Sequence, residues 1–181
     1  MARGFTTVAL AALVVASLAF SQSARAGGPG DDPAFCSNHL AYQQAGGKSP
    51  LDGKLNRQCI MTGVNTYLID GLQNNHADAV LLTDDAYRKT FGGDTQTDAE
   101  GIRNGIRNGQ EDAVGQVTNV EWTIEGNQAM TYWVGIFTGD TQPGFYVSER
   151  FTIREGKIAE ILLGGVQFAP NLCVTDDPCY P

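Results

Sequence analysis

The stretch FYVSERFTIREGKIAEILL, residues 145–163, carries the clearest structural pattern in the chain. Its first ten residues alternate with the period of two that is typical of a β-strand. One face of this strand is apolar except for Glu149, and the other face is mostly polar. Glu155-Gly156 then predicts a turn, and Lys157 to Leu163 predicts a partner strand. Because a carboxylate in an apolar stripe is costly to bury unless another group binds it, Glu149 is the best candidate for marking a functional pocket.

The same pattern extends toward the N-terminus. Val114 to Glu125 ends in alternation, and Gly126-Asn127 suits a tight hairpin turn. Gln128 to Phe137 is apolar on both faces, which predicts a strand covered on both sides. Gly164-Gly165 is expected to end the regular structure. These segments together predict four consecutive antiparallel strands.

Helical patterns precede the strands. Apolar residues fall at helical spacings from Cys59 to Leu72, and His76 to Leu82 predicts a second, short helix. Ala86 to Phe91 predicts a short strand. Thr97 to Glu100 has the form of a capping box, which predicts the start of a third helix.

The first residues are typical of an export signal. Val8 to Phe20 is apolar, and Ala24-Arg25-Ala26 has the small-x-small form of a cleavage site. We expect a signal peptide over residues 1–26, cleaved near Ala26, and a secreted or periplasmic protein; an uncleaved anchor is the alternative. Residues 27–58 predict an irregular N-terminal extension, and residues 59–169 predict a single domain.

Charge excludes two classes of partner. The whole chain has a formal net charge of −8, and removal of a leader that holds two arginines and no acidic residue leaves −10. Such a balance argues against binding nucleic acid or anionic lipid by charge. We therefore expect no nucleic acid and, after signal cleavage, no membrane among the partners.

Four cysteines follow the predicted cleavage site, and an even number in an exported chain predicts two disulfides. We favour Cys36–Cys59 and Cys173–Cys179, because each pair is local. The second pair would staple a C-terminal tail, residues 170–181. The alternative links the first pair to the second and joins the two ends of the chain. With only two histidines and no C-x-x-C spacing, we expect no metal site and no cofactor.

The order of elements resembles the nuclear transport factor 2-like, or SnoaL-like, superfamily, which includes ketosteroid isomerase. The resemblance rests on VNTYLIDGLQNNHADAVLLTDDA, Val64 to Ala86, and on SERFTIREGKIAEI, Ser148 to Ile161. It covers roughly Cys59 to Gly165. It implies an α+β, cone-shaped fold in which three N-terminal helices pack on a curved, mainly antiparallel sheet. The superfamily hosts enzymes, binding modules and assembly domains, so the resemblance does not select an activity.

The isomerase site carries over only in part. Its oxyanion tyrosine corresponds to Tyr67 and its protonated acid to Glu149. The position of its general base corresponds to Thr90, which has no accessible basic state near neutral pH. Asp94 replaces that base only if the turn before it folds inward. Dehydratases of this fold use a His–Asp pair, for which His76 is a candidate histidine.

Three functional hypotheses follow. In the first, a cavity between sheet and helices binds a small, mostly hydrophobic molecule. In the second, the protein is a cofactor-free isomerase, lyase or hydrolase. In the third, it is a surface or periplasmic interaction module that forms a homodimer through its open sheet face, where Tyr146 is exposed. The expected cavity lining is Tyr67, Trp122, Tyr132, Trp133, Glu149 and Phe151.

Each candidate residue also has a structural interpretation. In this interpretation, Glu149 forms a structural ion pair with Arg88, Arg103 or Arg107. Tyr67 and the aromatic residues of the strands fill the core. His76 is exposed at a helix start.

Overall fold

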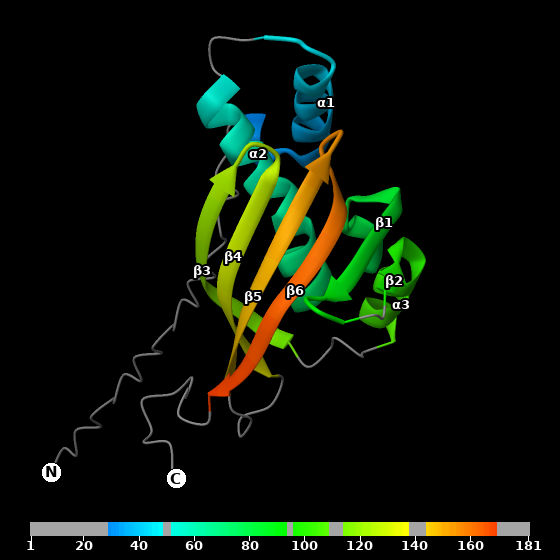
Figure 1. Cartoon of the computed structure of the whole chain (residues 1–181), viewed down its shortest axis with the longest axis vertical. Helices are drawn as coiled ribbons and strands as arrows, with labels where there is room; N and C mark the ends of the chain where they lie inside the picture. The colour runs from blue at the N-terminus through cyan, green and yellow to red at the C-terminus, as the bar shows by residue number, and fades with distance from the viewer. Residues whose placement is uncertain (1–28, 49–51, 94–95, 109–113, 138–143, 170–181) are drawn as a thin grey trace, which may run out of the picture.

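A six-stranded mixed sheet dominates the computed structural model, which describes residues 29–48, 52–93, 96–108, 114–137 and 144–169 (Figure 1). The strand order is β2-β1-β6-β5-β4-β3. The strands are β1 (Leu82–Thr90), β2 (Gln96–Asp98), β3 (Val114–Glu125), β4 (Gln128–Phe137), β5 (Gly144–Arg154) and β6 (Lys157–Ala169). Pairs β3–β4, β4–β5 and β5–β6 are antiparallel, which confirms the four-strand prediction. Strand β1 pairs with β6 in parallel and with β2 in antiparallel orientation.

The tight turns of the sheet occur where the sequence predicts them. Gly126 (φ 58°) turns the chain between β3 and β4, and Glu155 and Gly156 (φ 51° and 72°) turn it between β5 and β6. Positive φ angles of this kind match the right-handed twist of the flanking strands.

The helices cover one face of the sheet, and in Figure 1 the strands β3 to β6 lie in front of α2. They are α1 (Pro33–Gln44), α2 (Asp52–Asn65) and α3 (Ala99–Arg107), with one-turn 3₁₀ helices at Pro29–Asp31 and Ala77–Ala79. Helix α2 continues into a π-helix, Thr66–Gln73. The apolar core lies between these helices and the inward-facing side chains of the sheet. The fold is therefore α+β, with helices packed on one side of a curved sheet, as the sequence predicts.

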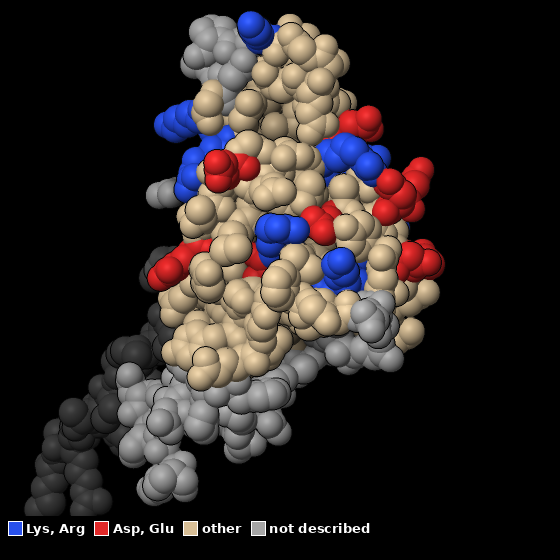
Figure 2. Space-filling view, viewed as in Figure 1, with Lys and Arg blue, Asp and Glu red and all other residues tan. Residues whose placement is uncertain are grey.

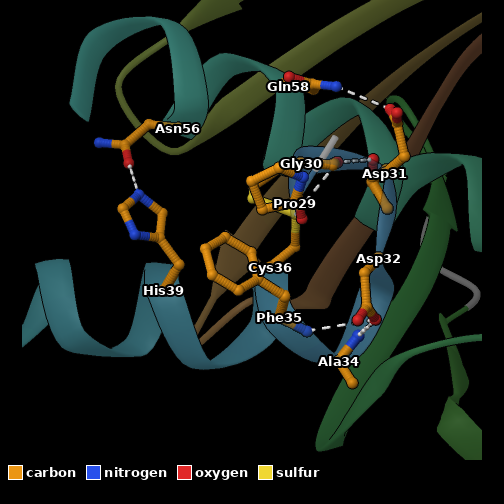
Figure 3. The surroundings of a disulfide bond; sticks show 12 residues. Pro29, Gly30, Asp31, Asp32, Ala34, Phe35, Cys36, His39, Asn56 and Gln58 are labelled. Carbon is orange, nitrogen blue, oxygen red and sulfur yellow. Dashed lines mark hydrogen bonds between the residues drawn. A yellow bond between two sulfur atoms is a disulfide. The ribbon is translucent and has the colours of Figure 1, made fainter. Parts of the chain in front are cut away.

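The N-terminal segment differs from the prediction. Residues expected to be irregular form α1 and the first half of α2, which begins at Asp52 rather than near Cys59. The Asp32 carboxylate accepts hydrogen bonds from the amides of Ala34 and Phe35, and this N-cap starts α1 (Figure 3). The sequence does not predict α1, because this helix buries only Cys36 and Leu40 and therefore has no periodic apolar pattern.

A disulfide joins the first two helices. Cys36 of α1 and Cys59 of α2 are bonded, with their Cα atoms 4.8 Å apart, which confirms the predicted pairing (Figure 3). His39 of α1 and Asn56 of α2 add a hydrogen bond between the same helices, 2.6 Å long. Cys173 and Cys179 lie outside the described residues, as do Asp94 and the predicted leader.

Three local predictions are wrong. The second helix is only a 3₁₀ turn, so β1 begins at Leu82 and is longer than expected. The cap of α3 is Asp98, whose carboxylate accepts from the Gly101 amide at 2.8 Å, instead of Thr97. Gly164-Gly165 does not end the last strand, because β6 continues to Ala169 across a bulge. None of the helices within the described ranges is long and apolar enough to cross a membrane.

Candidate functional site

Glu149 lies on the helix-covered face of β5, where only 1% of its side chain is exposed. Two groups hold its carboxylate. The Trp133 indole Nε1–H donates to Oε2 at 3.2 Å, and Arg88 Nη2 lies 3.8 Å from Oε1. Because a buried carboxylate needs such partners, this arrangement explains how a charge is tolerated in an apolar stripe. Arg88 is thus the ion-pair partner among the three arginines that the sequence offers.

The core around Glu149 is closed. Tyr67 and Phe151 are fully buried, and their ring centroids lie 5.7 Å apart. A side chain that lines a cavity large enough for water has accessible surface inside that cavity, and these two have none. The expected cavity is therefore filled at Tyr67 and Phe151, because the side chains of the helices and of the sheet close on each other there.

The other candidates are placed apart from this cluster. His76 is exposed at the 3₁₀ turn that begins at Ala77, and Thr90 is exposed at the end of β1. Trp122 is half-buried against the core. Tyr132 projects from the opposite face of the sheet and is 51% exposed, so its side chain points away from Glu149, whereas that of Trp133 points toward it. The described residues bring Tyr67, Trp133 and Phe151 together with Glu149 in one core, without an exposed acid–base partner.

Asp70 provides the polar contact of His76. The His76 amide donates to the Asp70 carbonyl at 2.7 Å. Burial raises the pKa of the Asp70 carboxyl, and the nearby His76 charge offsets part of this rise. This pair lies at the end of the π-helix, so it stabilises that end rather than forming a catalytic dyad with Glu149.

A groove of about 840 Å³ is lined by β3 to β6, and its large exposed side chains, Tyr132 and Tyr146, lie on the open face of the sheet, opposite to Glu149. We call it the open-face groove. Its lining residues come from the middle of β3 and β4, the first half of β5 and the last part of β6. Its lining residues are Asn119, Val120, Glu121, Tyr132, Trp133, Val134, Tyr146, Val147, Ser148, Gly165, Val166 and Gln167.

Two β-bulges flank the open-face groove. On β3 the pairing with β4 shifts between Thr118 and Glu121, where Asn119 has a φ of 51°. On β6 the pairing with β5 shifts so that Gly164 is the extra residue, and Gly165 then lies opposite Ser148. Bulges bend a strand and increase its local twist. We therefore attribute the hollow in the sheet to these two irregularities.

Gly165 forms an open floor in this hollow. It contributes no side chain, and a Cβ atom built on it meets only Ser148 Oγ, at 4.0 Å. Its neighbour Gly164 is different, because a Cβ there would lie 2.7 Å from the same oxygen. Gly164 thus allows the bulge to approach the Ser148 hydroxyl closely, and Gly165 leaves the floor of the groove without a side chain.

Two tyrosines dominate the walls of the groove. Tyr132 of β4 is 51% exposed and Tyr146 of β5 is 49% exposed. Tyr132 pairs with Ser148 and Tyr146 pairs with Val134, so the two rings are diagonal neighbours on adjacent strands. The Tyr132 hydroxyl donates to Met130 Sδ at 3.4 Å, which orients the ring along the strand.

Charge is sparse in the open-face groove. Glu121 is the only charged residue among its described lining residues. Figure 2 shows charged side chains over the upper and middle parts of this face and along both edges, and a largely uncharged surface below them. Arg150, on the same face of β5, is paired with Glu160 at 3.3 Å. The groove therefore offers no fixed positive charge to a ligand within the described residues.

Glu160 anchors a polar cluster beside the groove. It accepts hydrogen bonds from Tyr87 at 2.7 Å and from Thr152 at 2.8 Å, besides the contact with Arg150. Burial raises the pKa of the Glu160 carboxyl, but the hydrogen bonds and the Arg150 charge together lower it below its usual value. The hydrogen bond between Tyr87 and Glu160 also raises the pKa of the Tyr87 hydroxyl. This cluster keeps the positive charge of Arg150 engaged.

The sequence does not reveal this site. Asn119, Gly165 and Gln167 are not among the predicted site residues, and Tyr132, expected to line a cavity between sheet and helices, lies on the open face instead. The available signal is the combination of an exposed Tyr146 with paired glycines in the adjoining strand, since glycine inside a strand often marks a bulge. Which residues line one groove depends on the pairing register of the four strands, and the sequence alone does not predict that register.

Comparison with known proteins supports the fold. A family model described as a domain of unknown function, DUF8021, matches residues 54–162. A search of curated proteins finds no match. An NTF-2 like protein of unknown function from Burkholderia xenovorans is 16% identical, with a TM-score of 0.50 over 68% of this chain and 91% of the other. The fold is thus that of the NTF2-like superfamily, as the sequence resemblance implied.

Two further structures are similar at a lower score. An LEH-like epoxide hydrolase from M. tuberculosis is 22% identical, with a TM-score of 0.49 over 59% of this chain and 77% of the other. An NTF2-like protein of unknown function from Cytophaga hutchinsonii is 15% identical, with a TM-score of 0.46 over 61% and 90% of the two chains. At these values neither likeness bears on the activity of this chain.

Proposed function

This chain belongs to the DUF8021 family, and on that premise we propose that it is an exported domain that binds a small, uncharged and partly hydrophobic molecule in the open-face groove. The proposal keeps the ligand class expected from the sequence and moves the site to the other face of the sheet. Export is supported by the predicted leader and by the Cys36–Cys59 disulfide, which is compatible with an oxidising compartment.

One observation carries the proposal: two half-exposed tyrosines stand over a groove of about 840 Å³. Volumes of roughly 300–1,000 Å³ are typical of small-molecule sites. A tyrosine ring offers a large apolar surface together with a polar hydroxyl, so it contributes much of the binding energy where it is buried by a partner. Tyr132 and Tyr146 supply both properties at adjacent positions.

A catalytic role for Glu149 and Tyr67 is less well supported. A substrate would have to reach two side chains that are each exposed by 1% or less. Glu149 accepts a hydrogen bond from Trp133 and is paired with Arg88, so its carboxylate already has partners within the protein. We therefore favour binding over catalysis.

The test is a titration with the neutral dye Nile red, followed by its fluorescence, with native mass spectrometry as a check on stoichiometry. We expect one site, weakened at least tenfold by Tyr132→Ala and by Tyr146→Ala. Tyr42→Ala is the matched control, because Tyr42 is 57% exposed on α1, away from the groove. Glu149→Gln should leave binding unchanged. Binding that is lost in Glu149→Gln and retained in both groove variants would contradict the proposal.

A second candidate, homodimerisation, is favoured by a specific observation. Met130, Tyr132 and Tyr146 are all large, exposed and on the same face of the sheet. Such a face is suited to a second copy of the chain. Light scattering across a concentration series checks this: a mass that doubles in the wild type and not in Tyr146→Ala would support a dimer, and a constant monomer mass would exclude one.

A further inference from the structure

The chemistry of the open-face groove identifies a ligand class. We infer that its ligand is a neutral saccharide, bound with the C–H face of a sugar ring against Tyr132 and Tyr146. This inference rests on the proposed function of the same groove. It goes beyond that function because it names hydroxyl groups, rather than apolar surface alone, as the chemistry that the site recognises.

The polar lining is made of amides and hydroxyls. Asn119, Ser148 and Gln167 line the groove from three different strands, together with the carboxylate of Glu121. A side-chain amide both donates and accepts hydrogen bonds, and a carboxylate accepts two. These groups match neighbouring sugar hydroxyls, each of which also donates and accepts. A purely apolar ligand would leave all of them without partners and lose binding energy.

Charge excludes an anionic ligand. The described lining contains no lysine or arginine, and the chain has a formal net charge of −8. Arg150, on the same face, is already paired with Glu160. A phosphate or carboxylate ligand would therefore enter a negative field without a counter-charge.

The shape fits a flat, hydrated ring. The groove lies on the exposed face of the sheet, and a ligand there keeps one side in water. Gly165 leaves the floor without a side chain beside Ser148, so a saccharide can lie over the backbone of β6 next to Tyr146 and extend across Ser148 to Tyr132. A sugar is suited to this position because its faces differ: one presents C–H groups to an aromatic ring, and its edges present hydroxyls to amides and to water.

The experiment probes the full chain on an array of neutral glycans and then measures the affinity of a positive oligosaccharide by calorimetry. Tyr132→Ala and Gly165→Val should each weaken binding at least tenfold. The first removes a stacking surface, and the second fills the floor at a position that accepts a Cβ without a clash.

Gln167→Leu separates this inference from the proposed function. It removes an amide and keeps the apolar bulk, so saccharide affinity should fall at least fivefold and by more than the affinity for Nile red. Nile red binding at the tyrosines with no glycan bound would overturn the saccharide inference and leave the proposed function standing. A wild-type protein that binds neither Nile red nor any glycan would overturn both. Glycan binding that Tyr132→Ala and Gly165→Val do not change would overturn the saccharide inference alone. Unaltered thermal unfolding of each variant is the control for folding, and Tyr42→Ala is the control for exposed aromatic residues.

Discussion

Removal of Arg88 should destabilise the protein, because it leaves the buried Glu149 carboxylate without its ion-pair partner. The two charged groups lie 3.8 Å apart, and Glu149 is 1% exposed while Arg88 is 27% exposed. Removing one partner of a fully buried pair costs about 3–5 kcal/mol. Since Arg88 is partly solvated and Trp133 still donates to the carboxylate, we expect Arg88→Met to lower the free energy of unfolding by about 2–3 kcal/mol.

The assay is equilibrium unfolding in urea, supported by thermal unfolding. For a chain of this length, about 2–3 kcal/mol corresponds to a fall in Tm of roughly 5–10 °C. Glu149→Gln should cost less, because the amide oxygen still accepts from Trp133 and no buried charge remains. The double variant should resemble Glu149→Gln, which corresponds to a favourable coupling of about 2–3 kcal/mol in the mutant cycle.

Arg107→Met is the matched control. Arg107 also forms ion pairs, with Asp78 and with Glu100, but all three side chains are well exposed. Exposed pairs contribute little to stability, so this variant should unfold at nearly the wild-type urea concentration. A urea midpoint for Arg88→Met equal to that of the wild type and of Arg107→Met would refute the structural role assigned to the Glu149 pair.

Three further outcomes are expected. The double variant Cys36→Ser/Cys59→Ser should lose about 3 kcal/mol of stability in urea unfolding, since the cross-link spans 23 residues, and an unchanged midpoint would contradict this. The pKa of Glu160 is lowered in the folded state, so its contribution is present above its unfolded pKa and is lost as pH falls through the folded value; Glu160→Gln should therefore show a shallower loss of Tm in acid than the wild type. Gly156→Ala should destabilise more than Gly126→Ala: both have positive φ, but only at Gly156 would a Cβ atom lie 2.2 Å from the main chain of α1, and equal Tm shifts would count against that contact.

The sequence predicts the long strands because their pattern is local. Alternation within 145–154 and tight turns at Gly126 and Gly156 are properties of neighbouring residues, and the structure confirms them. The burial of Glu149 also follows from alternation. Its partner does not, because Arg88 reaches it from another part of the sheet.

What the sequence does not predict depends on contacts between distant segments. Helix α1 buries little apolar surface and is held through its disulfide to α2, so it has no strong periodic pattern. The sequence predicts that the last strand ends at Gly164-Gly165, because the role of Gly164 in a bulge depends on the register with β5. The open-face groove was missed for the same reason, since two bulges on separate strands create it.

The parallel pairing of β1 with β6 has a consequence for the order of folding. Tyr87 and Glu160 bond across this pair although 73 residues separate them, whereas Trp133 and Glu149 bond across neighbouring strands only 16 residues apart. Closing the longer loop costs more chain entropy and is repaid only when the β6 edge already exists. We expect β4, β5 and β6 to form the nucleus and β1 to dock late, so that amides of β5 gain protection before those of β1 in pulse-labelled hydrogen exchange. Simultaneous protection of both strands would exclude this order. A newly synthesised chain would then expose its β6 edge until β1 arrives, and this is the interval in which the molecule is most open to association with other chains.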